Sequence, residues 1–215
     1  MDASLHRLLV DALGEETVLD GGSVLAPSSP DGVAAVLRIA QERRLRLRLT
    51  SGPAAEGADP LRDGALLSMG RLSTVQVDAS NGVVRAEAGV TLTALTAALA
   101  DAGMAVPGLS TDPGSDHVGA LIARGGVPRR SLTGIEAALP GGDLVQLGGA
   151  VLKDVVGYDI ASVLLGSRGS LAAIIAVHLR LIPAAAAVEV AEPAGARDVG
   201  ELTGVFDPEG TLVGG

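Results

Sequence analysis

One stretch near the C-terminal end constrains the fold of this 215-residue chain most tightly. Residues 171–183 read LAAIIAVHLRLIP, an aliphatic run long enough for one continuous strand that the proline closes. Alternation puts the apolar positions on one face of this strand. His178 and Arg180 fall on the other face, where we expect His178 to be exposed. The sequence LGSRGS just before the strand predicts a tight glycine turn, preceded by a short helix.

Simple patterns along the rest of the chain predict two lobes and a tail. Capping residues such as Ser29, with Pro30 in the first turn after it, apolar spacing and turn residues indicate β-α-β, a loop and then β-β-β-α over about residues 15–103. Two further strands joined by a Gly-Gly turn lead into the long strand, so we expect a second lobe over about residues 132–183. Residues 1–183 then make one domain. We interpret residues 184–215 as a loosely attached tail or the stump of a missing domain, because they are rich in Gly, Pro and acidic residues.

The composition excludes several classes of function. The chain has no Cys, which removes disulfides and Cys nucleophiles, and no two of its three His stand at metal-ligand spacing. Its formal net charge of −9 argues against a nucleic-acid partner, because the phosphate backbone requires a basic face. One Tyr, one Phe and no Trp leave a planar cofactor to be held by aliphatic side chains and backbone. Neither a membrane-spanning apolar run nor a signal peptide is visible, so we expect a cytoplasmic protein.

A first loop of small residues follows the β-α-β pattern. Residues 51–57 read SGPAAEG, and such loops expose backbone N–H groups that hold phosphate oxygens without a charged side chain. Pro53 lacks an N–H and Glu56 adds a negative charge, and both weaken that interpretation. The loop is therefore either a phosphate cradle or an ordinary surface loop.

A second candidate segment spans residues 107–130. It carries Arg124, Arg129 and Arg130, three of the 16 Lys and Arg residues of the chain. In an acidic protein this local cluster indicates a nearby anion, unless the segment is a solvated loop. His117 lies in the same segment and is either a hydrogen-bond partner for a cofactor or a plain loop residue.

These motifs resemble a known family of flavoproteins. The order GYDI, apolar run, GSRGSL, long aliphatic strand and proline resembles the FAD-binding domain of FAD-linked oxidases of the vanillyl-alcohol oxidase and p-cresol methylhydroxylase type. KDVVGYD is most similar to the FAD-binding subunit of bacterial glycolate oxidase, and VLAPSSPDGVAAVL, LSMGRL and VRAEAGVTLTAL extend the resemblance to the first lobe. It implies an α+β FAD-binding domain in which two lobes of small sheets with flanking helices enclose a cleft. The cap domain that holds substrate in that family would begin where this chain ends, so we expect it to be absent.

The resemblance also implies which residues hold the flavin. The loop at 50–59 has neither His nor Cys, so we expect non-covalent FAD. Gly119 is expected to let the pyrophosphate approach the backbone, and Ala120 stands where the family usually has a second glycine. No catalytic or metal-binding residue is predicted. The residues expected to contact the cofactor are Gly52, Pro53, Ala54, Ala55, Pro107, Ser110, His117, Val118, Gly119, Ala120, Arg129, Arg130, Tyr158, Gly169 and Ile174.

Two functions remain open at this point. The first is an FAD-binding subunit of a glycolate-oxidase-like 2-hydroxy acid oxidoreductase complex, which transfers electrons through its flavin and is inactive alone. The alternative is a flavin-free structural or interaction subunit that keeps the fold. The mean hydropathy of +0.42 and the missing cap predict an uncovered apolar surface on part of residues 171–183 and on the start of the tail. We expect a catalytic flavoprotein subunit with an iron–sulfur subunit, or a second copy of the chain, to cover it.

Overall fold

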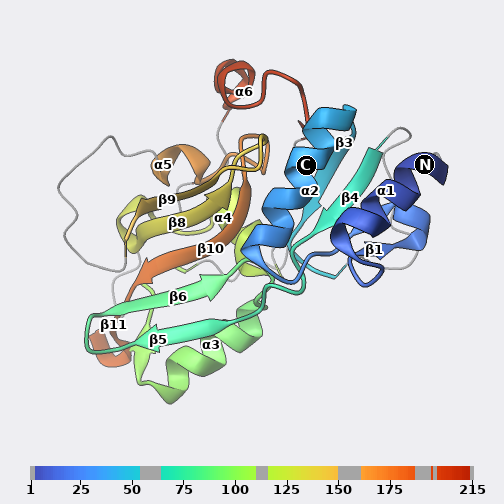
Figure 1. The fold of residues 1–215 in the computed structure, drawn as a ribbon. Helices are drawn as coiled ribbons and strands as arrows, with labels where there is room; N and C mark the ends of the chain where they lie inside the picture. The colour runs from blue at the N-terminus through green and yellow to red at the C-terminus, as the bar shows by residue number, and fades with distance from the viewer. Residues whose placement is uncertain are drawn as a thin grey trace.

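The computed structural model shows two sheets side by side, with helices packed around both (Figure 1). The residues that it describes are 3–53, 64–109, 116–149, 161–186, 195 and 198–213. Within them the chain forms two five-stranded sheets and one two-stranded ribbon. The α+β class and the two-lobed arrangement expected from the sequence are confirmed.

The first sheet is built on a β-α-β unit near the N-terminus. Its strands, in order across the sheet, are β1 (Val18–Leu19), β2 (Val24–Leu25), β4 (Gly64–Ser68), β3 (Arg46–Thr50) and β12 (Leu212–Val213). All neighbours except β1 and β2 run parallel. Two helices, α1 (Ala3–Leu13) and α2 (Pro30–Arg43), belong to this lobe. The hydroxyl of Ser29 caps α2 by accepting a hydrogen bond from the Gly32 N–H (3.1 Å), so α2 begins where the sequence predicts.

The second sheet is antiparallel and joins distant parts of the chain. Its strands, in order, are β5 (Val75–Asp78), β6 (Val83–Glu87), β10 (Ala173–Arg180), β8 (Leu132–Ala138) and β9 (Leu144–Gly148). Because β5 and β6 pair into this sheet, the segment expected as the first lobe contributes strands to both sheets. The ribbon pairs β7 (Met104–Ala105) with β11 (Ile182–Pro183). Helices α3 (Leu92–Asp101), α4 (Val118–Ala123) and α5 (Ala161–Leu164) pack on the second sheet, and α2 also contacts its strands β8 and β9.

The described part of the tail is packed against the first sheet. Helix α6 (Gly200–Phe206) leads to β12, which pairs in parallel with β3 and places Leu212 opposite Leu47. The buried carboxylate of Asp207 accepts hydrogen bonds from the backbone N–H groups of Thr211 (2.9 Å) and Leu212 (2.6 Å). A loosely attached tail is therefore the wrong description of this segment. That the tail is the stump of a further domain stays a prediction.

Strand β10 is the middle strand of the second sheet and is buried over almost its whole length. Every residue from Leu171 to Leu179 is buried, and so is Leu181. The predicted uncovered apolar surface on residues 171–183 is therefore wrong for the strand, because β6, β8 and α4 pack against it. The start of the tail, residues 184–186, is exposed as expected.

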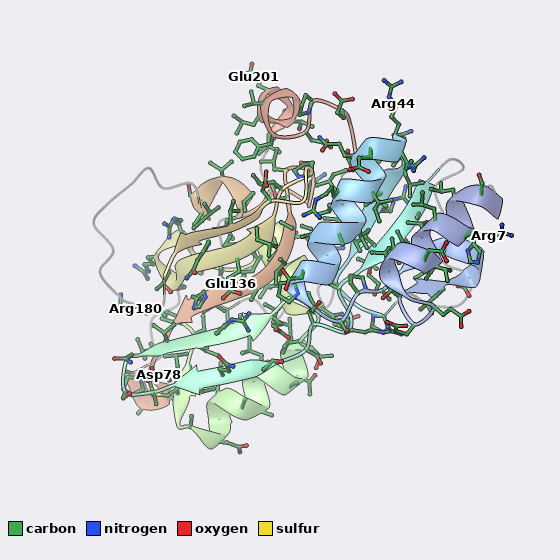
Figure 2. All side chains as sticks on the ribbon, in the orientation of Figure 1. Arg7, Arg44, Asp78, Glu136, Arg180 and Glu201 are labelled. Atoms are coloured by element: carbon green, nitrogen blue, oxygen red, sulfur yellow. The ribbon has the colours of Figure 1, made fainter. Side chains whose placement is uncertain are left out.

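His178 is buried rather than exposed, and it belongs to a group of polar side chains that crosses β10. Its Nε2 lies 2.8 Å from Oε1 of Glu136 on β8. From β6 on the other side of β10, the Arg85 guanidinium donates to both carboxylate oxygens of Glu136 (2.7 and 2.6 Å). Ala176 stands opposite Glu136 on β10, and its small side chain leaves room for this ion pair. Figure 2 shows Glu136 on the sheet.

The pairing has a consequence for the pH dependence of stability. Hydrogen bonds from Arg85, and then from His178, hold the pKa of Glu136 below its ordinary value of 4.5, while burial opposes the shift. A carboxylate with a lowered folded-state pKa stabilises the protein above its unfolded pKa, and this stabilisation is lost as the pH falls through the folded pKa.

We therefore expect Glu136→Gln to lower the free energy of unfolding at pH 7 by about 1–3 kcal/mol, because the glutamine cannot pair with the guanidinium. The difference from the unchanged protein should shrink as the pH falls below about 4. Urea unfolding at several pH values measures it, with Glu42→Gln on the exposed side of α2 as the matched control. An equal difference at pH 7 and at about pH 3 would contradict the ion-pair account.

Candidate functional site

A cavity of about 420 Å³ lies where the two lobes meet. This volume falls in the range of about 300–1,000 Å³ that small-molecule sites occupy. Its walls come from the ends of β3 and β4, from α4, and from the turn before β10 together with the start of β10. The lining residues are Leu49, Thr50, Ser51, Met69, Gly119, Ala120, Ala123, Arg124, Arg168, Gly169, Ala172 and Ile174.

The first wall is formed where two parallel strands end at the same edge of the sheet. The Thr50 carbonyl accepts a hydrogen bond from the Met69 N–H (2.8 Å), which aligns the two strand ends. The buried Ser68 hydroxyl donates to the Gly52 carbonyl (2.8 Å) and accepts from the Gly70 N–H (3.2 Å). The start of the predicted phosphate loop is therefore fixed by the neighbouring strand, at the carboxyl ends where open parallel sheets usually bind ligands.

The second wall is the start of α4, which is fastened to the second sheet. Backbone N–H groups of Val118 and Gly119 donate to the carbonyls of Val90 and Ala88, each at 2.8 Å. A Cβ added at Gly119 would lie 2.5 Å from Ser51 Oγ and 2.9 Å from Ala88 Cβ. Gly119 therefore allows the two lobes to pack closely. A branched side chain there would push the two lobes apart. Loss of a ligand in a Gly119 variant would therefore not show that Gly119 contacts the ligand.

The third wall is the tight turn before β10, which holds the end of α4. The Gly166 N–H donates to the Ile122 carbonyl (3.0 Å) and the Arg168 N–H to the Ala123 carbonyl (2.8 Å). The predicted turn is confirmed, with positive φ at both glycines and also at Arg168 (+55°). Gly169 packs on β3, since a Cβ there would lie 3.3 Å from Leu49 Cδ1.

The cavity is apolar with a cationic edge. Among the described residues that line it, the only ionisable side chains are those of Arg124 and Arg168, and both are exposed to solvent. No carboxylate, His or Lys lines it in this part of the chain, so the described walls contain no candidate general base. Such a cavity suits a largely apolar ligand that carries a negative charge.

The structure brings some of the predicted cofactor contacts to this cavity and leaves others away from it. Gly119, Ala120, Gly169 and Ile174 line it. Gly52 and Val118 are sequence neighbours of the lining residues Ser51 and Gly119. Gly52 itself packs against His117, since a Cβ on Gly52 would lie 2.7 Å from the His117 ring. The remaining predicted residues that the structure describes do not line the cavity: Pro53, Pro107, His117, Arg129 and Arg130.

Two of these residues have structural contacts instead. The Pro107 carbonyl accepts a hydrogen bond from the buried Ser131 hydroxyl (2.6 Å), and the Arg129 guanidinium donates to the Leu132 carbonyl. Of the three clustered arginines, only Arg124 reaches the cavity. The predicted contacts Ala54, Ala55, Ser110 and Tyr158, and the KDVVGYD motif, lie outside the described residues.

Sequence reasoning missed Arg168 and the β3 and β4 side chains of the cavity. The available signal for Arg168 is its place inside the predicted GSRGS turn, next to Gly169, which is expected from the sequence to contact the cofactor. The alternation of β3 gives no such signal for Leu49 or Ser51, since it does not reveal that the strand end faces the second lobe.

Comparison with known proteins identifies the family. Residues 22–153, more than half of the chain, match the model of an FAD binding domain. An uncharacterised FAD-linked oxidoreductase of Mycobacterium tuberculosis is 34% identical over 168 residues, which cover 73% of this chain and 37% of that protein. A D-lactate dehydrogenase of Archaeoglobus fulgidus is 32% identical, covering 74% and 38%. The glycolate oxidase subunit GlcD of Bacillus subtilis is 27% identical, covering 75% and 37%. The chain therefore belongs to the FAD-binding domain family of FAD-linked oxidoreductases.

Solved structures show the same fold. The 4-ethylphenol oxidase from Gulosibacter chungangensis superposes with a TM-score of 0.66 at 21% identity, covering 84% of this chain and 42% of that one. Berberine bridge enzyme gives 0.62 at 18% identity, covering 85% and 39%. The matched part of this chain thus spans about two-fifths of the length of its relatives. In the described part of the chain, no helix has the length and apolarity needed to cross a membrane.

Proposed function

We propose that the cavity between the lobes binds FAD non-covalently and that the chain is the FAD-binding subunit of a glycolate-oxidase-like 2-hydroxy acid oxidoreductase complex. The observation that carries the proposal is the coincidence of the family match with a cavity built by Gly119, Ala120 and Gly169. Lactate and glycolate, the 2-hydroxy acids named for two of the relatives, suggest the substrate class.

The residues present fit the cofactor. Small and aliphatic side chains line most of the cavity and leave backbone accessible, as a chain with one Tyr, one Phe and no Trp requires. The two arginines at the edge can balance the negative charge of a dinucleotide. When bound, FAD supplies the electron transfer. The protein holds and orients it, through the strand end at Thr50–Gly52, the start of α4 and the turn before β10.

The chain is proposed to work with partners rather than alone. The described walls of the cavity carry no general base that could take a proton from a 2-hydroxy acid. A catalytic flavoprotein subunit and an iron–sulfur subunit would provide the substrate site and the electron path; self-association is the other arrangement to test. A flavin-free interaction subunit is the alternative function, favoured by Ala120 in place of the family's second glycine.

Filling the cavity should remove the flavin. Ala120 lines the cavity and is half-buried, so Ala120→Leu should occupy ligand volume without disturbing the tight packing at Gly119. We expect the purified protein to show the absorbance of oxidised flavin and Ala120→Leu to lose at least about nine-tenths of it, corresponding to a Kd raised tenfold or more. Ala97→Leu, an exposed change on α3, is the matched control. A colourless unchanged protein that cannot be reconstituted with FAD would favour the flavin-free alternative.

The isolated chain should not oxidise 2-hydroxy acids even when loaded with FAD, because it lacks a proton acceptor beside the cavity in its described part. Steady-state assays with glycolate and D-lactate and an artificial electron acceptor measure this. Multiple turnovers by the chain alone would show that the proposed dependence on a catalytic partner is wrong.

A further inference from the structure

Arg168 adopts a backbone conformation that suits glycine rather than arginine. Its φ of +55° is in the left-handed region, where a Cβ is crowded by the backbone. The flanking positions of the same turn with positive φ, Gly166 and Gly169, carry no Cβ. The Arg168 N–H is held on the Ala123 carbonyl at 2.8 Å, so the surrounding structure enforces the conformation. Strained backbone of this kind concentrates at functional sites, so the Arg168 side chain is a candidate for a functional role.

Arg168 brings a positive charge to the cavity wall, and no described residue pairs with that charge. Arg168 lines the cavity, and its guanidinium has no hydrogen bond or ion pair with any described residue. Arg124, the C-cap of α4, contributes a second cation to the same walls. In a chain with a formal net charge of −9, two arginines share this cavity edge and no described lining residue is acidic. The local charge is therefore opposite to that of the whole molecule.

We infer that Arg168, with Arg124 beside it, binds the diphosphate of the dinucleotide in this cavity. The inference rests on the proposed function. The diphosphate is the charged part of FAD, and a guanidinium offers a planar set of N–H donors that matches phosphate oxygens. The tight turn puts Arg168 on the wall of a cavity whose other described lining residues, apart from Arg124, are uncharged. A glycine at this position would relax the backbone and remove the anion contact.

The test uses the same substitution at two arginines with the same backbone strain. Arg168→Gly should raise the melting temperature of the ligand-free protein by about 2–4 °C, because glycine accepts positive φ. It should weaken FAD binding about tenfold or more, since a charge-assisted contact is lost. Arg44→Gly is the matched control, because Arg44 has a φ of +53°, is exposed at the C-cap of α2 and does not line the cavity. It should raise the melting temperature similarly and leave FAD affinity unchanged.

Three ligands separate the possible outcomes: FAD, riboflavin, which lacks the phosphates, and ADP, which carries a diphosphate without the flavin. Weaker binding of FAD and ADP to Arg168→Gly, with riboflavin binding within about twofold of the unchanged protein, supports the inference. Unchanged FAD affinity, or an equal loss for FAD and riboflavin, overturns it while the FAD proposal stands. Binding of ADP but not FAD by the unchanged protein, with ADP weakened in Arg168→Gly, supports the anion site and overturns the proposed function. Binding of neither overturns both.

Discussion

Strand β10 is the element on which the fold and the candidate site both depend. It pairs with β6 on one side and β8 on the other, so the second sheet forms only when residues from both halves of the chain meet. Its aliphatic side chains are buried almost without exception, and removing them from water favours formation of the second sheet. The ion pair of Arg85 and Glu136 crosses the same strand, with His178 hydrogen-bonded to Glu136, and it keeps partly buried charges paired. Residues at the start of β10 then form one wall of the cavity.

The cavity exists because small residues bring the lobes together without filling the space between them. Gly119 packs against Ser51 and Ala88, and Gly169 packs against Leu49. Between these contacts a cavity remains, lined mainly by small and aliphatic residues together with Arg124 and Arg168. This arrangement explains how a chain almost without aromatic residues can offer a dinucleotide site. The described walls supply positioning and charge, and they contain no candidate general base.

The sequence predicted features that depend on neighbouring residues and missed those that depend on distant ones. The cap at Ser29 and the glycine turn before β10 are local, and both are confirmed. Strand pairing is not local, so the assignment of β5 and β6 to the second sheet could not be obtained from spacing. His178 was predicted to be exposed, but the structure buries it beside Glu136 of β8, a strand neighbour that sequence spacing does not reveal. Arg168 was missed because the turn pattern predicts where its glycines stand but not that the arginine between them lines a cavity.

Backbone hydrogen exchange in the presence and absence of FAD tests most directly whether the cavity between the lobes is the cofactor site. The account predicts that saturating FAD slows exchange in three separate segments that line the cavity, residues 49–53, 118–124 and 166–174. Exchange in the β5–β6 hairpin, residues 75–87, should stay the same, because none of its residues line the cavity. Saturation with FAD that leaves the three segments unprotected, or protects only other parts of the chain, would contradict the account.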